Sequence, residues 1–129
     1  MEGNMQKVLY VEDNPLNMSL MHHIFKKTLP GILLLEAESA EAGLVLAEGE
    51  RPDLIILDIG LPGLSGYEAM ELLRGKESTK DIPVLAISAF AQPSDLGKAK
   101  EAGFAGYITK PFQVKPFTEQ VKEILAKER

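Results

Sequence analysis

The side chains able to take part in chemistry lie at the ends of four apolar runs of strand length, either as the last residue of the run or directly after it. They are Glu12 and Asp13, Asp58, Ser88, and Lys110. The runs that lead to them cover residues 8–11, 54–57, 83–87 and 106–109. Open α/β sheets place their ligands at the edge where the carboxyl ends of parallel strands meet. The runs therefore predict that three carboxylates, a hydroxyl and an ammonium share one crevice.

Three carboxylates in one crevice repel one another, and one would be driven to take up a proton unless a cation intervenes. Oxygen ligands without histidine or thiolate favour a hard ion, above all Mg²⁺, which shares its shell with waters and phosphate oxygens. Lys110 makes little sense as a metal ligand but suits a phosphoryl group as a point charge. Ser88 can donate a hydrogen bond to the same group. The set therefore predicts phosphoryl transfer to a carboxylate.

Each of these residues also has a simpler interpretation. A strand-terminal aspartate such as Asp58 is usually a turn or cap residue, and Glu12-Asp13 can be a solvated strand end. Ser88 can be a plain helix-entry residue and Lys110 a surface charge. For any one residue the simpler interpretation is favoured. Their joint occurrence at four strand ends is hard to obtain by chance, and it favours a shared site.

The elements that must position this site alternate along the chain. Unbroken aliphatic runs such as Leu54–Leu57 are typical of parallel strands buried on both faces, and Ile32–Leu35 supplies a fifth run. A helix is predicted after each strand. Five strands alternating with five helices predict an α/β fold, (βα)5, doubly wound with right-handed crossovers. We expect a five-stranded parallel sheet in the flavodoxin-like order 2-1-3-4-5.

Capping residues mark where the first three helices begin: Asn14 with Pro15, then Ser39, then Ser65 with Glu68 in an S-x-x-E pattern.

Helical spacing predicts the apolar face of the first helix: Leu16, Leu20, Met21, Ile24 and Phe25. His22 and His23 are adjacent on this helix, so they do not share a face and are predicted to be surface or boundary residues. The second helix is expected to end at Gly49 and the last to start at Pro116. The fourth, within residues 94–102, is expected to be the most mobile because Gly97 lies in its interior.

The bulk composition is that of an ordinary globular domain. The 129 residues are 45% hydrophobic and 26% charged, with a net charge of -5, which fits one domain spanning residues 1–129. The net negative charge does not favour binding to nucleic acid or to an anionic membrane. The lack of cysteine excludes disulfides and thiolate metal sites. Because the sequence shows neither a signal core nor an apolar run long enough to span a bilayer, a cytoplasmic protein is expected.

Taken together, these residues resemble the receiver domain of two-component response regulators. The resemblance rests on Val11 to Pro15, on Asp58 to Gly66, on Ser88-Ala89 and on Lys110-Pro111-Phe112, and it covers the chain from about Lys7 to the end. It implies that Asp58 accepts a phosphoryl group from a histidine of a partner kinase or phosphotransfer protein. It also implies that Asp13 binds Mg²⁺ directly, that Glu12 does so through water, and that the Gly60 carbonyl completes the protein's share of the metal shell.

The resemblance further implies a switch. Lys110 and Ser88 would contact the phosphoryl oxygens, and the movement of Ser88 toward them would free space that Tyr107 fills. This would rearrange the surface of the fourth helix, fifth strand and fifth helix, where a downstream protein target docks. The Lys110–Pro111 bond would be cis. The protein would then be a signalling protein of a two-component system or phosphorelay, with self-phosphorylation and autodephosphorylation at Asp58 but no turnover as an enzyme. It would be either a single-domain regulator or the receiver of a longer protein.

Three other functions compete with this one. A phosphatase of the haloacid dehalogenase type needs a second aspartate two residues after Asp58, where this chain has Gly60. A flavin module of flavodoxin type must cradle a phosphate in its first loop, where Glu12-Asp13 would repel it unless a metal bridged them. The third alternative is a receiver-fold platform that binds partner proteins without phosphorylation, and the presence of every phosphorylation residue argues against it.

Overall fold

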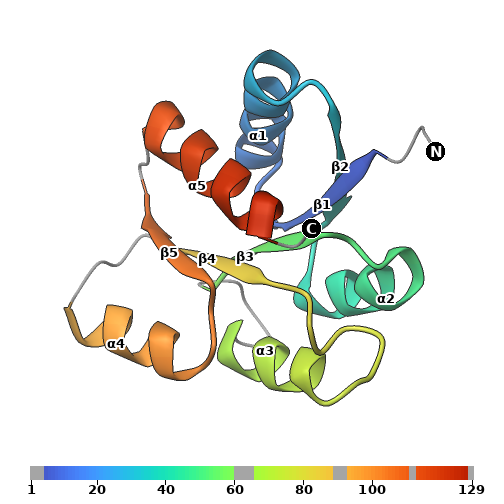
Figure 1. The fold of residues 1–129 in the computed structure, drawn as a ribbon, viewed down its shortest axis with the longest axis vertical. Coiled ribbons are helices and arrows are strands. Elements are labelled where there is room, and N and C mark those ends of the chain that lie inside the picture. The colour runs from blue at the N-terminus through green and yellow to red at the C-terminus, as the bar shows by residue number, and fades with distance from the viewer. Residues whose placement is uncertain (1–4, 60–65, 89–92, 111–112, 128–129) are drawn as a thin grey trace.

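The described part of the chain folds into strands that alternate with helices, as the sequence predicts. The structure, a computed structural model, describes residues 5–59, 66–88, 93–110 and 113–127. In chain order the elements are β1 (Gln6–Val11), α1 (Pro15–Thr28), β2 (Ile32–Ala37), α2 (Ala40–Glu50), β3 (Leu54–Asp58), α3 (Gly66–Arg74), β4 (Val84–Ser88), α4 (Pro93–Glu101), β5 (Gly106–Thr109) and α5 (Val114–Lys127) (Figure 1).

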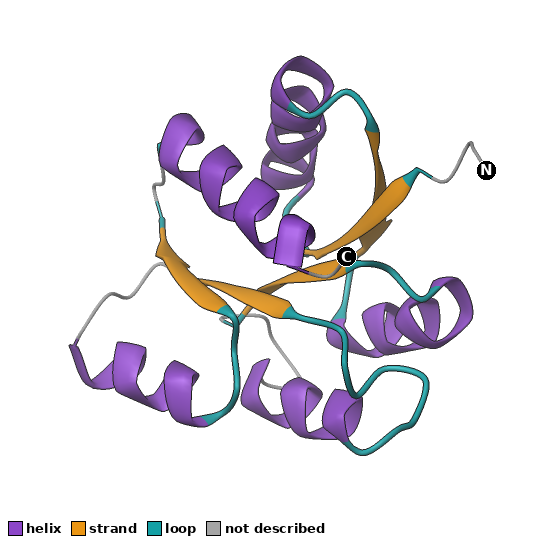
Figure 2. Cartoon of the chain, viewed as in Figure 1, coloured by secondary structure: helices purple, strands orange, loops and turns teal. Residues whose placement is uncertain are grey.

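The strands form one parallel sheet in the order β2-β1-β3-β4-β5, which confirms the predicted doubly wound, flavodoxin-like topology. Helices α1 and α5 cover one face of the sheet, and α2, α3 and α4 cover the other (Figures 1 and 2). In the register of the sheet, Val11 lies beside Leu57 and Ser88 lies beside Thr109. The carboxyl ends of the strands therefore meet at the same edge.

Every residue of β3 and β4 is buried, because helices cover both faces of these central strands. Along β3, Leu54 and Ile56 pack into the core that α1 and α5 close, whereas Ile55 and Leu57 pack into the core on the α2–α3–α4 side. Side chains of a strand alternate between faces, so a strand between two cores needs apolar residues at each position. This explains why the run before Asp58 contains no polar residue.

Two of the predicted helix starts are confirmed by side-chain caps. The Asn14 side chain accepts hydrogen bonds from the backbone N–H groups of Leu16 and Asn17, and Ser39 accepts one from Ala42. The third predicted cap, Ser65, lies outside the described residues.

Two helix boundaries differ from the predictions. Helix α2 ends at Glu50 rather than at Gly49, and Arg51 supplies the left-handed cap with a φ of 48° while its N–H donates to the Ala47 carbonyl. Helix α5 begins at Val114 rather than at Pro116. Helix α4 lies where predicted and contains Gly97, while its mobility stays a prediction. None of the helices in the described ranges is long and apolar enough to cross a membrane.

The predicted apolar face of α1 is wrong at Leu16 and Leu20, whose side chains are 80% and 52% exposed. The buried positions of this helix are Met18, Met21, Ile24 and Phe25. At 3.6 residues per turn, Leu16 and Leu20 lie roughly 160–200° around the helix axis from Met18. The helix carries apolar residues on two sides, and the sheet covers only one of them.

The two glycines inside α2 offer a test of how closely this helix packs on the sheet. A methyl group added at Gly43 would lie 2.8 Å from Cγ2 of buried Val11, whereas no described atom lies within 4 Å of one added at Gly49. Alanine in place of helical glycine stabilises by about 0.5–1 kcal/mol, but overpacking a core costs about 1–3 kcal/mol. We expect Gly49→Ala to raise the free energy of unfolding and Gly43→Ala to lower it by about 1 kcal/mol. Urea unfolding followed by circular dichroism measures both.

The two variants control for each other, since they make the same chemical change in one helix. A Gly43→Ala variant as stable as Gly49→Ala would contradict the close approach of α2 to β1.

Candidate functional site

Lys110 lies at the centre of a cluster of charged side chains at the carboxyl edge of the sheet. It follows β5, and its backbone N–H donates to the Ser88 carbonyl at 2.7 Å. Its side-chain Nζ lies 2.6 Å from Oδ2 of Asp58 and 2.9 Å from Oε1 of Glu12. The structure therefore brings together three of the residues that the sequence placed in one crevice, from the ends of β1, β3 and β5.

The two carboxylates of this cluster are almost fully withdrawn from water. Glu12 is 2% exposed and Asp58 is 8% exposed. Burial alone would raise the pKa of Glu12, but hydrogen bonds from Lys110 and from the Asn14 N–H hold that pKa below its usual value. Burial would lower the pKa of Lys110, and its contacts with Asp58 and Glu12 raise that pKa instead. One partly buried ammonium therefore pairs with two buried carboxylates.

Glu12 has two further hydrogen-bond partners that the sequence analysis missed. The Tyr10 hydroxyl donates to Oε1 of Glu12 at 3.0 Å, and the Asn14 backbone N–H donates to Oε2 at 3.1 Å. The sequence predicts Tyr10 only as part of an apolar strand. The available signal was its spacing, because residues two apart on an extended strand point to the same face. Burial, with the nearby Glu12 charge, raises the pKa of Tyr10 far above its usual value, so its hydroxyl stays a donor.

Ser88 and Tyr107 lie on neighbouring strands beside the cluster. Ser88 ends β4 and is 4% exposed, and it aligns with Thr109 of β5. Tyr107 aligns with Ala86 and is partly buried against the core on the α2–α3–α4 side of the sheet. The two residues therefore lie on neighbouring strands, and the switch expected of them stays a prediction.

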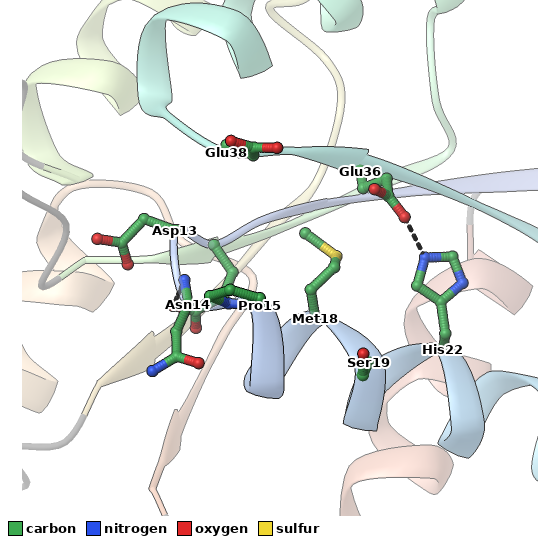
Figure 3. Close-up of a pocket in the computed structure, with 9 residues that line it drawn as sticks. Asp13, Asn14, Pro15, Met18, Ser19, His22, Glu36 and Glu38 are labelled. Carbon is green, nitrogen blue, oxygen red and sulfur yellow. Dashed lines mark hydrogen bonds and ion pairs between the residues drawn. The ribbon is translucent and has the colours of Figure 1, made fainter.

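Asp13 directly follows Glu12 in the chain. It is exposed, and together with Glu12 it lines a cavity of about 400 Å³ between the start of α1 and the end of β2. Figure 3 shows Asp13 and Glu38 on either side of this cavity, with Met18 between α1 and β2. His22 lies at the far end of the cavity, and its Nε2 is 2.5 Å from Oε2 of Glu36 (Figure 3). His22 and His23 are both exposed, as predicted.

The carboxylates at this edge of the sheet suit a hard cation better than a soft one. Glu12, Asp13 and Asp58 all offer carboxylate oxygens at one edge of the sheet, and oxygen ligands are those that Mg²⁺ prefers. Among the described residues, no three histidine or carboxylate side chains converge into a preformed metal cage. Gly60, whose carbonyl was predicted as a further ligand, lies outside the described residues, as does Pro111 of the predicted cis bond.

Comparison with known proteins identifies what this arrangement resembles. The family model described as the response regulator receiver domain matches residues 8–122. The polar-differentiation response regulator DivK of Brucella ovis is 38% identical over 120 residues, which are 93% of this chain and 96% of DivK.

Solved structures agree with this result. The receiver domain of the sensor histidine kinase PA1611 from Pseudomonas aeruginosa, with a magnesium ion in its active site cleft, is 28% identical with a TM-score of 0.84. A putative response regulator from Chloroflexus aurantiacus is 29% identical with a TM-score of 0.87. Each comparison covers 95% of this chain and 99% of the other.

The Lys110 cluster predicts a pH-dependent loss of stability when the ammonium is removed. In metal-free buffer at pH 7, we expect Lys110→Met to lower the free energy of unfolding by about 3 kcal/mol. This value is at the low end of the loss expected when a buried ion pair is broken, because the lysine side chain is partly exposed. Without the lysine, burial raises the pKa of Glu12, so the folded variant takes up a proton as pH falls. Its deficit relative to the unaltered protein should therefore shrink between pH 7 and about pH 5. Urea unfolding across this range measures the effect.

Lys76→Met provides the matched control, because Lys76 pairs with Glu48 at 3.0 Å where both side chains are exposed. Exposed pairs contribute about 0–1 kcal/mol, so this variant should lose little stability at any pH. Equal losses in the two variants would contradict the role assigned to the buried cluster.

Proposed function

This chain belongs to the response regulator receiver domain family, and from that membership we propose that Asp58 is its phosphoacceptor. Receiver domains of this family act in two-component signalling. The donor would be a phosphohistidine of a histidine kinase or of a histidine phosphotransfer protein. The observation that carries the proposal is the Lys110 ammonium in contact with both Asp58 and Glu12 at the carboxyl edge of the sheet.

The transfer exchanges one bond to phosphorus for another. A carboxylate oxygen of Asp58 attacks the phosphorus atom, an acyl phosphate O–P bond forms, and the N–P bond to the imidazole breaks. Lys110 lies 2.6 Å from Oδ2 of Asp58, so it stands beside the atoms that take up the phosphoryl group. It exchanges its carboxylate contacts for contacts with phosphoryl oxygens. The Ser88 hydroxyl, at the end of the neighbouring strand, donates a hydrogen bond to the same group.

Mg²⁺ is the proposed cofactor. When bound, it neutralises charge on the phosphoryl oxygens. Asp13, Asp58 and the Gly60 carbonyl would hold it, and Glu12 would do so through water. The carboxylate oxygens of Glu12, Asp13 and Asp58 support this assignment, as does the cavity that Glu12 and Asp13 line. The magnesium ion in the 28% identical PA1611 receiver supports it further.

The proposed output is a change in the face formed by α4, β5 and α5. Ser88 moves toward the phosphoryl group, and Tyr107 fills the space that it leaves. The adjacency of β4 and β5 supports this coupling, because it places both residues on neighbouring strands. A downstream protein target binds the changed face, without direct contact to nucleic acid or membrane. Residues 1–129 act as one receiver domain, and its cytoplasmic location stays a prediction.

Incubation with acetyl phosphate and Mg²⁺, followed by intact mass measurement, tests the acceptor chemistry. We expect the protein to gain the mass of one phosphoryl group. The Asp58→Asn variant should gain none, because its amide is not a nucleophile for this reaction. A chelator should abolish the gain in the unaltered protein, because three carboxylates repel an unshielded phosphoryl donor.

Asp81→Asn is the matched control, since Asp81 is an exposed aspartate after α3, and this variant should be labelled normally. No adduct under conditions that label a known receiver would contradict the proposal. It would favour the alternative, a receiver-fold platform that binds partners without phosphorylation.

A further inference from the structure

Tyr10 carries a hydroxyl where packing alone requires none. The residue is 1% exposed and belongs to the core between the sheet and helices α1 and α5, which also contains Ile56 and Phe117. A phenylalanine would fill almost the same volume, so burial of the ring does not explain the hydroxyl. A hydroxyl buried without a partner is unfavourable, and among the described residues this one donates to Oε1 of Glu12 at 3.0 Å.

The donors to Glu12 differ in how firmly they are held. Oε1 receives the Tyr10 hydroxyl and the Lys110 ammonium, and Oε2 receives the Asn14 backbone N–H. Tyr10 is fixed by the close packing of the core, and Asn14 is fixed as the cap of α1. The Lys110 side chain is 22% exposed, long, and shared with Asp58. The two firmly held donors bind one carboxylate oxygen each, so together they define its orientation without Lys110.

We propose that Tyr10 is a positioning residue, whose hydroxyl holds the Glu12 carboxylate in the orientation that binds Mg²⁺ through water. The inference rests on the proposed function, since it takes Glu12 as a metal contact and Lys110 as a contact of the phosphoryl group. When Lys110 turns to the phosphoryl oxygens, Glu12 loses one donor on Oε1. Tyr10 then keeps that buried oxygen hydrogen-bonded, and the carboxylate does not rotate.

The test is a titration of the protein with MgCl₂, followed by two-dimensional amide NMR, which measures weak affinities and reports the fold at the same time. Losing a hydrogen bond that orients a metal-binding side chain lowers metal affinity by about 10–100-fold. Because Glu12 acts through water, we expect Tyr10→Phe to weaken Mg²⁺ binding by about tenfold, at the low end of that range.

Two further variants separate positioning from general loss of stability. Thr79→Val also removes a buried hydroxyl, which donates to the Leu73 carbonyl at 2.6 Å in the segment between α3 and β4, at the opposite edge of the sheet. It should bind Mg²⁺ as tightly as the unaltered protein does. In a Glu12→Ala background, Tyr10→Phe should cause no further loss of affinity, because the carboxylate that it positions is absent.

The outcomes distinguish this inference from the function on which it rests. If the unaltered protein bound no Mg²⁺, the proposed cofactor and this inference would both be wrong. If it bound Mg²⁺ and Tyr10→Phe bound it equally well, only the role of Tyr10 would be overturned. Equal weakening in Thr79→Val, or an undiminished effect of Tyr10→Phe in the Glu12→Ala background, would also overturn that role.

Discussion

The rest of the site depends on one constraint, which is that two carboxylates are buried at the edge of the sheet and one ammonium lies between them. A charge withdrawn from water is strongly unfavourable unless it is paired and hydrogen-bonded. Lys110 contacts both Glu12 and Asp58. Asp58 ends β3, whereas Lys110 follows β5, and β4 lies between these two strands. The contact therefore needs a long side chain that passes the end of β4, and it forms only when the strands lie in this order.

A single ammonium leaves this edge negatively charged, and that charge limits what the site can bind. Asp13, Glu36 and Glu38 line the neighbouring cavity and add further negative charge. A phosphoryl group that approached these carboxylates alone would be repelled, whereas a divalent cation would be attracted. The charge distribution thus explains why the proposed chemistry requires the lysine and a metal ion together.

Two tyrosines near the site lie on opposite faces of the sheet and differ in how tightly they are packed. On the α1–α5 side, Tyr10 lies in a closely packed core and donates to Glu12. On the opposite side, Tyr107 is only partly buried, on a short edge strand that aligns with β4. A fully packed aromatic residue can hold a carboxylate still, while a partly packed one has room to change position. In the proposed mechanism, the first residue fixes the metal contact and the second transmits the response to α4, β5 and α5.

The sequence by itself determined the fold and which three charged residues are neighbours at the edge of the sheet. Apolar runs with polar ends gave the five strands, Asn14 and Ser39 marked two helix starts, and the strand ends identified Glu12, Asp58 and Lys110 as neighbours. Only the tertiary structure decided that Leu16 and Leu20 face solvent, because a helix with apolar residues on two sides does not reveal which side the sheet covers. Only the tertiary structure showed that Tyr10 binds Glu12 while Asp13 lies at the surface. Spacing along a chain fixes which residues share an edge, but the distances among their side chains depend on how separate elements pack.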